Sequence, residues 1–305
     1  MKGPTLNGWL SWSYNDIPYS CRTTKDDDYK VHVNIPQNLT VKSYYEEIYD
    51  NSRTMRDYFS GDFDVLLSGG IDSEVIVRTL KDLGIRHNTY IFRYEDDLNY
   101  REISAAIDIC QCINIPYKIV DLNLRKFFEN EAYDLFKASG CIRAGRLPHL
   151  KFFDYLDNIP VMGEGEGYWW RDGGINYNES SIWRFPMNES NHNASMYLHK
   201  MGRENVCDWY EFTPSFIKSF NQLPIIQETI NDNHVGKQSS WWARIPIHRQ
   251  IWPDIKDKGK LIGYEQYAPA GTYPPFMTEL QQVMEKEIGP GQEYWYTQDE
   301  LNNFI

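Results

Sequence analysis

In the segment Phe63-Asp64-Val65-Leu66-Leu67-Ser68-Gly69-Gly70-Ile71-Asp72-Ser73, an apolar run leads directly into a Ser-Gly-Gly turn. After the turn, apolar side chains recur with helical spacing at Val75, Leu80 and Leu83, and Gly84 closes the pattern. This order of signals predicts a buried strand, a tight loop and the first turn of a helix.

The residues of this loop are suited to binding a polyphosphate. Gly69 and Gly70 let the backbone turn without a Cβ in the way, so that successive N–H groups can point into one concave space. The N-terminus of the following helix adds unsatisfied N–H donors and a partial positive charge. Ser68 and Ser73 add hydroxyl groups. Asp72 would repel phosphate unless a cation lay between them, so it is predicted to be a magnesium ligand.

The same strand-and-helix unit repeats after the loop. Strands are predicted at 88–93, 117–121 and 160–162, and helices at 103–113, 124–136 and 147–156. This alternation favours a doubly wound parallel sheet of the α/β class. Before the loop, residues 1–40 indicate a few short strands and residues 43–58 a helix, whereas the chain after residue 176 is expected to be mostly helical and irregular.

The amino-acid composition excludes several classes of protein. With 305 residues, 41% hydrophobic and 24% charged, the chain is typical of a folded protein of about two domains. Its 31 basic and 43 acidic residues give a net charge of −12, which argues against binding to nucleic acid. The five cysteines form no CxxC pair, so neither a zinc site nor a disulfide framework is predicted. Because there is no signal peptide and no run of roughly 18 apolar residues, we expect a cytoplasmic protein with no membrane partner.

Residues 63–73 resemble the signature of the PP-loop ATP pyrophosphatase superfamily, whose loop reads Ser-Gly-Gly-x-Asp-Ser. The resemblance covers about residues 60–170. It implies a sheet of the adenine nucleotide hydrolase type, with ATP and Mg²⁺ as cofactors. It also implies cleavage of ATP to AMP and pyrophosphate while the substrate is activated as its adenylate. Adenine is expected at the carboxyl ends of the first two strands, near Leu67 and Phe92. The nucleotide-binding candidates are Leu67, Ser68, Gly69, Gly70, Ile71, Asp72, Ser73, Phe92, Met162 and Gly163.

A second segment, Val161-Met162-Gly163-Glu164-Gly165-Glu166-Gly167-Tyr168, resembles the Gly-Glu-Gly-x-Asp-Glu loop of asparagine synthetases and β-lactam synthetases. The resemblance assigns Glu164 as the base for an amine that attacks the adenylate. The magnesium-binding Asp of that family falls on Gly167 and its last Glu on Tyr168, so neither matches. Glu166 is the nearest replacement for the lost metal ligand, and aspartate as the substrate is placed in doubt.

Basic candidates lie in two other places. Residues 251–260 loosely resemble the late Lys-bearing stretch of those synthetases, which implies that Lys258, with Lys260 next in order, neutralises the departing pyrophosphate. A solvated basic turn is the competing interpretation. The three residues ahead of the fourth strand that could reach phosphate or a substrate carboxylate are Arg143, Arg146 and His149, and a capping or surface role is equally open.

These observations predict an ATP- and magnesium-dependent synthetase with Asp72, Glu164 and Lys258 as catalytic residues. It would adenylate a small-molecule carboxylate and pass the acyl group to an amine. No glutaminase domain is expected ahead of the loop, so the amine would arrive free or belong to the acceptor. The expected division is 1–60 as a β-rich extension, 61–175 as the ATP-binding domain and 176–305 as a helical region over the substrate. Two alternatives remain: modification of a nucleobase or nucleotide, of the tRNA or 7-deazaguanine type, and a nucleotide-binding module without turnover. The oligomeric state is left open.

Overall fold

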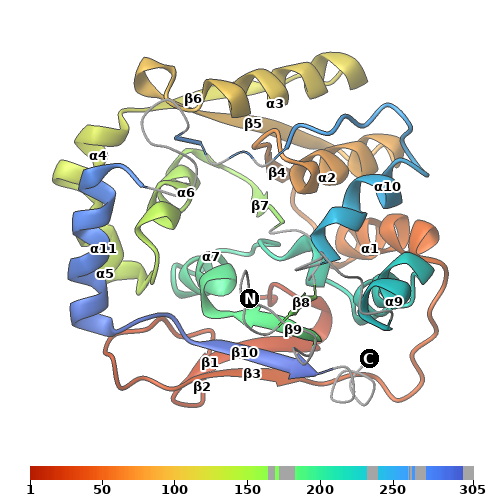
Figure 1. The fold of residues 1–305 in the computed structure, drawn as a ribbon, viewed down its shortest axis with the longest axis horizontal. Helices are drawn as coiled ribbons and strands as arrows, with labels where there is room; N and C mark the ends of the chain where they lie inside the picture. Colours follow the sequence, from red (N-terminus) through yellow and green to blue (C-terminus); the bar gives the residue numbers. More distant parts are fainter. Residues whose placement is uncertain are drawn as a thin grey trace.

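A computed structural model describes residues 1–163, 169–171, 183–231, 240–259, 261, 263–264 and 273–297. At its centre is a four-stranded parallel sheet in the order β6-β5-β4-β7 (Figure 1). Its strands are β4 (Phe63–Leu66), β5 (His87–Tyr94), β6 (Lys118–Leu122) and β7 (Ile159–Val161). The register pairs Val65 with Thr89 on one side and with Val161 on the other. The predicted α/β fold with a parallel sheet is confirmed.

The order of the strands creates a switch point beside β4. The chain adds β5 and then β6 on one side of β4, and then returns to add β7 on the other side. Ligands of open α/β sheets bind where the strand order reverses, beyond the carboxyl ends of the strands. The segments that leave β4 and β7 at this edge are the Ser-Gly-Gly loop and Met162–Gly163.

The helices that accompany the sheet follow the predicted pattern. They are α1 (Tyr44–Tyr58), α2 (Ile71–Asp82), α3 (Tyr100–Ile113), α4 (Leu124–Asn130), α5 (Ala132–Ser139) and α6 (Leu147–Phe152). In α2, Val75, Ile76 and Leu80 are fully buried, as their spacing predicts. The helix predicted over 124–136 is divided in two, because Glu131 has a φ of −127° and leaves the helical region.

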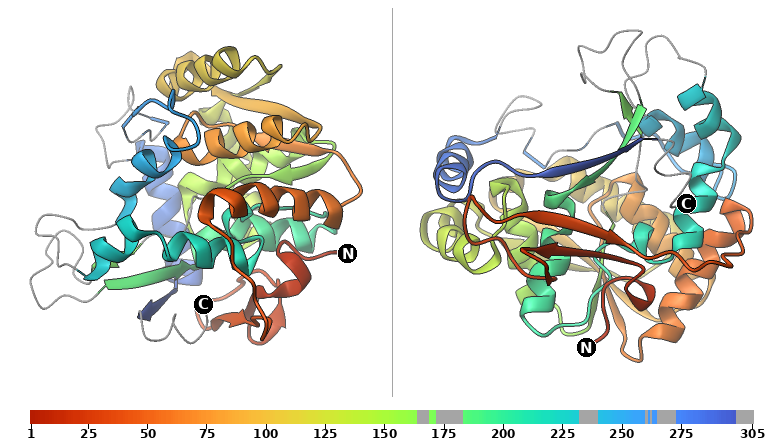
Figure 2. Two further views of the ribbon diagram at one scale, coloured as in Figure 1. Left: turned by 90° about the vertical axis from the view of Figure 1, so that its right-hand side faces the viewer. Right: turned by 90° about the horizontal axis from the view of Figure 1, so that it is seen from below.

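A separate antiparallel sheet precedes the loop, in line with the β-rich N-terminal segment predicted from the sequence. Its strands are β1 (Leu10–Tyr14), β2 (Ile17–Pro18) and β3 (Tyr29–Val33), in the order β2-β1-β3. Figures 1 and 2 show this sheet and α3 at opposite ends of the molecule. The sheet packs on α7 (Glu189–Lys200), where the Trp12 and His192 ring centroids are 3.9 Å apart.

The second half is mostly helical, as expected, but it also contains strands that the sequence did not predict. The helices after α7 are α8 (Pro214–Asn221), α9 (Pro224–Asn231), α10 (Arg244–His248) and α11 (Pro275–Ile288). The added sheet is antiparallel, in the order β10-β9-β8, with β8 (Trp170–Arg171), β9 (Trp183–Asn188) and β10 (Glu293–Thr297). Because β9 pairs with residues about a hundred positions later, its sequence neighbours do not reveal the pairing. The domain boundaries at residues 60 and 175 stay a prediction.

Candidate functional site

The Ser-Gly-Gly loop joins the buried end of β4 to the first turn of α2. Gly69 has a φ of +80°, and a Cβ built there would lie 2.6 Å from the carbonyl oxygen of Glu102 in α3. Only glycine fits this conformation and this close approach. The Ser68 N–H donates to Ser73 Oγ at 3.1 Å, and that hydroxyl lies 3.2 Å from both Ser68 Oγ and the Gly70 carbonyl oxygen. The loop is therefore held in its turn by its own side chains.

Asp72, in the first turn of α2, forms an ion pair with Arg244 of α10. The Asp72 side chain is 23% exposed and the Arg244 side chain only 2%. The Asp72 backbone carbonyl also accepts a hydrogen bond of 3.0 Å from the hydroxyl of Tyr210. Sequence reasoning missed both partners, because neither lies in a motif and both are more than a hundred residues away from Asp72.

The residues expected to bind adenine line one pocket. Leu67, Ser68 and Phe92 line a narrow pocket of about 40 Å³ at the carboxyl ends of β4 and β5. Phe152 of α6 extends the aromatic wall, with its ring centroid 4.3 Å from that of Phe92, and His149 lies on the same side. Such a wall suits a flat heterocycle. The structure thus brings these residues together, and their assignment to adenine stays a prediction.

Tyr94 and Asn99 complete the polar part of this pocket. Burial raises the pKa of Tyr94 well above its usual value, followed in effect by the nearby Tyr264 and Glu102. The Asn99 side-chain amide donates to the Phe92 carbonyl oxygen at 2.8 Å and so fixes the end of β5. Both side chains are uncharged, and Glu102 contributes a carboxylate to the same pocket.

Met162 and Gly163 reach the same region from β7. The Met162 N–H donates to the Val206 carbonyl at 3.1 Å. A Cβ on Gly163 would lie 2.8 Å from the Tyr210 ring and 3.0 Å from Ile76 Cδ1 of α2. The second glycine-rich segment therefore starts against the helix that carries the phosphate-binding candidates. Glu164 and Glu166 lie outside the described residues, and their roles as base and metal ligand stay predictions.

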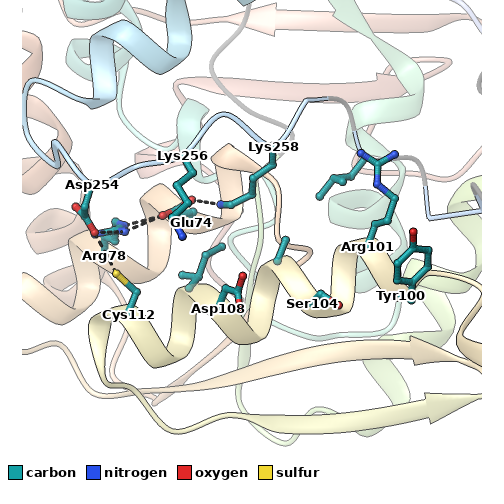
Figure 3. A pocket seen from close by; sticks show the side chains of 13 residues that line it. Glu74, Arg78, Tyr100, Arg101, Ser104, Asp108, Cys112, Asp254, Lys256 and Lys258 are labelled. Carbon is teal, nitrogen blue, oxygen red and sulfur yellow. Dashed lines mark hydrogen bonds and ion pairs between the residues drawn. The ribbon is translucent and has the colours of Figure 1, made fainter.

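Lys258 lies beside the first turn of α2 rather than in a solvated turn. Its ammonium group forms an ion pair with Glu74, whose side chain is 2% exposed, and its own side chain is 18% exposed (Figure 3). The Arg78 guanidinium bridges Glu74 and Asp254, with both Nη2–oxygen distances at 2.8 Å. Burial lowers the pKa of Arg78, but the hydrogen bond to Asp254 and the charge of Glu74 outweigh it, so the pKa ends above its usual value. This network fixes the Lys258 segment along α2. Lys260 lies outside the described residues.

A pocket opens between this network and α3. It has a volume of about 310 Å³, is open to solvent, and is lined on one side by Lys256 and Lys258 and on the other by Tyr100, Arg101 and Asp108 (Figure 3). Arg143 does not join either pocket: its guanidinium is 3.9 Å from Glu293 and lines a separate hollow near α11. His149, another of the three basic residues proposed ahead of β7, lines the same pocket as Ser68.

One cluster of metal-ligand type stands out within the described part of the chain. The ligand atoms of His192, Asp208 and Glu211 lie within 4.8 Å of one another, in the space between α7 and the short 3-10 helix Trp209–Glu211. His192 Nε2 is 3.2 Å from Glu211, and its Nδ1 is 2.5 Å from the Tyr29 hydroxyl. No sequence motif links these three residues, so the sequence did not predict this cluster. Within the same described part, no helix has the length and apolarity needed to cross a membrane.

Comparisons with known proteins match the segment that holds the loop. Residues 64–144 match the family model described as "Queuosine biosynthesis protein QueC". A 7-cyano-7-deazaguanine synthase from Methanocaldococcus jannaschii is 40% identical over 110 residues, 34% of this chain and 47% of the relative. The chain thus spans about half the length of this curated relative. These matches support the predicted resemblance of segment 64–144 to PP-loop ATP pyrophosphatases, whereas they do not support the narrower resemblance to asparagine synthetases.

Two solved structures show weaker similarity. An NMN synthetase from Francisella tularensis is 21% identical, with a TM-score of 0.27 over 39% of this chain and 49% of that one. An NH3-dependent NAD synthetase from Campylobacter jejuni is 12% identical, with a TM-score of 0.31 over 80% of this chain and 92% of that one.

Proposed function

We propose that this chain is an ATP-dependent enzyme that activates the carboxylate of a 7-deazaguanine-type substrate and releases AMP and pyrophosphate. The observation that carries the proposal is the match of residues 64–144, loop included, to the QueC family model, supported by the 40% identity to a 7-cyano-7-deazaguanine synthase. The match covers 47% of that relative. The activity and the substrate of this chain are therefore both proposed here.

The residues of the loop and of the first turn of α2 are suited to binding a nucleoside triphosphate together with Mg²⁺. Gly69 and Gly70 keep the turn narrow, the N-terminus of α2 adds N–H donors and a partial positive charge, and Ser68 and Ser73 present hydroxyls. Asp72 is the carboxylate available for the metal. When bound, Mg²⁺ would neutralise phosphate oxygens. The loop would then stabilise the charge that builds up on the departing pyrophosphate, which is electrostatic catalysis combined with positioning.

The chemistry of a nitrile links this function to the activation step predicted from the loop. Attack of ammonia on an acyl adenylate expels AMP and gives a primary amide. If a second ATP then adenylates the oxygen of that amide, loss of AMP and a proton gives a nitrile. A carboxylated 7-deazaguanine could therefore become a cyano product through two successive adenylations, each of which consumes one ATP and releases AMP and pyrophosphate. In this proposal Glu164 remains the candidate base for the incoming amine, and Lys258, which is paired with Glu74 of α2, remains the candidate cation for the departing pyrophosphate.

The proposal is tested by following pyrophosphate release from ATP with Mg²⁺, ammonium and one of two acceptors, 7-carboxy-7-deazaguanine or aspartate. We expect release with the deazaguanine acid, and an amide or nitrile product by mass spectrometry. Release with aspartate alone would favour an asparagine synthetase-like ligase. ATP binding with no release for either acceptor would favour a nucleotide-binding module. Asp72→Asn should abolish the release, and Asp50→Asn, a surface carboxylate paired with Lys42 and Arg53, should not.

A further inference from the structure

Arg244 is a buried cation aimed at the phosphate-binding loop. It begins α10, and its guanidinium forms the ion pair with Asp72 in the first turn of α2. Ala243 and Ile247, on either side of it, are completely buried, so α10 is anchored in the core. Arg244 itself is 2% exposed, whereas Asp72 keeps 23% of its side chain open to solvent. A ligand can therefore approach the Asp72 carboxylate from the solvent side, opposite the buried arginine.

The two groups favour different partners once nucleotide and metal arrive. The Asp72 carboxylate is a hard oxygen ligand suited to Mg²⁺. A guanidinium binds phosphate oxygens as well as it binds carboxylates, and it carries its charge at any ordinary pH. A buried cation is stabilised by an adjacent anion, so a phosphate oxygen would stabilise Arg244 when the Asp72 carboxylate turns to the metal.

We propose that Arg244 is a positioning residue that couples metal binding to nucleotide binding by exchanging partners. It holds Asp72 in the ligand-free protein and turns to a phosphate oxygen when Asp72 takes the metal. This inference rests on the proposed function. Because linkage is reciprocal, the exchange means that nucleotide strengthens metal binding and metal strengthens nucleotide binding. In the ligand-free protein, the same pair keeps Asp72 from binding metal alone.

The coupling is measured with two probes that need no turnover. One is the affinity for a β,γ-imido ATP analogue, measured by calorimetry with Mg²⁺ present. The other is the affinity of the nucleotide-free protein for Mn²⁺, measured by electron paramagnetic resonance. In Arg244→Met we expect the analogue to bind about tenfold more weakly and Mn²⁺ to bind several-fold more tightly. Arg244→Lys, which keeps the charge but not the planar fork, should show smaller shifts of the same opposite signs.

The matched control is Arg22→Met, which removes the arginine of another buried pair, Arg22–Glu189, whose side chains are 2% and 0% exposed. It should leave both affinities unchanged. General damage to the fold would weaken both probes together, so the opposite signs separate positioning from a structural role. If both affinities fall, or neither changes, in both Arg244 variants, the inference is overturned. A wild-type protein that binds no analogue would end the proposed function and the phosphate half of the exchange. Tighter Mn²⁺ binding in Arg244→Met would then still support the part of the inference in which Arg244 keeps Asp72 from binding metal.

Discussion

Two buried arginine–carboxylate pairs serve different regions of this molecule. In the N-terminal region, Arg22 Nη1 lies 3.1 Å from Glu189 Oε2, and Glu189 also accepts from the Tyr14 hydroxyl and from the Gln292 N–H. Every contact of that carboxylate joins two parts of the fold. At the loop, the Asp72 carboxylate faces Arg244 on one side and solvent on the other. The comparison teaches that a pair enclosed on all sides is a structural link, whereas a pair with one open side leaves room for a ligand.

The enclosed pair should give the largest loss of stability when it is broken. Arg22→Met leaves Glu189 buried without its cation, and we expect a loss of about 3–5 kcal/mol in the free energy of unfolding. Chemical denaturation measures it. Burial already raises the pKa of Glu189, against the hydrogen bonds from Tyr14 and Gln292, so its charge depends on these partners. A loss below about 1 kcal/mol, the size typical of exposed ion pairs, would contradict the structural role.

Loss of the Asp72 carboxylate from the Asp72–Arg244 pair should reduce the rate of the reaction rather than the stability of the fold. Asp72→Asn removes the candidate metal ligand at the loop, and we expect pyrophosphate release to fall by at least about a hundredfold, or about 2.7 kcal/mol. Initial rates at saturating ATP measure this fall, while circular dichroism checks the fold. Full activity in Asp72→Asn would contradict the role of Asp72 as a metal ligand.

The turn beneath the open pair can be tested separately. Gly69→Ala combines a positive φ with a Cβ 2.6 Å from the Glu102 carbonyl oxygen, and should cost about 1–3 kcal/mol of stability. Gly84→Ala, after the other end of α2, has a φ of +65° but nothing within 4 Å of the added Cβ, so it carries only the strain of the backbone. The difference between the two variants isolates the close packing of the loop on α3. Equal losses would show that this packing is not tight.

The smallest effect is expected at the hydrogen bond that holds the backbone of Asp72. Tyr210→Phe removes the 3.0 Å bond from the hydroxyl to the Asp72 carbonyl and should cost about 0.5–1.5 kcal/mol. It should also raise the KM for ATP, because the first turn of α2 loses a support. The control is Tyr49→Phe, which removes a bond to Asp82 at the far end of α2 and should leave the KM unchanged. A shift in both variants would point to a general loss of helix stability.

Local signals explain what the sequence could predict. β4, the loop and α2 are specified by adjacent residues, since an apolar run, two glycines and helical spacing follow one another between Phe63 and Leu83. The alternation that follows was sufficient to predict β5, α3, β6 and β7. The division at Glu131 was missed because it depends on a backbone angle that no sequence pattern marks.

Contacts between distant residues were beyond such signals. Arg244 and Tyr210 reach Asp72 only because α10 and the 3-10 helix fold back over α2, and the β8–β10 sheet depends on pairing between residues that are far apart in the chain. The assignment to asparagine synthetases rested on the short segment 161–168, in which two positions already departed from the family, and on a looser resemblance of residues 251–260. The comparisons with known proteins favour the 7-deazaguanine alternative instead.

A crystal structure of the full chain with Mg²⁺ and a non-hydrolysable ATP analogue tests the central claim most directly. We predict the β- and γ-phosphates on the N–H groups of residues 69–73, with the Asp72 carboxylate turned from Arg244 to the metal. A nucleotide bound elsewhere, or bound at the loop with the Asp72–Arg244 pair intact, would contradict the account.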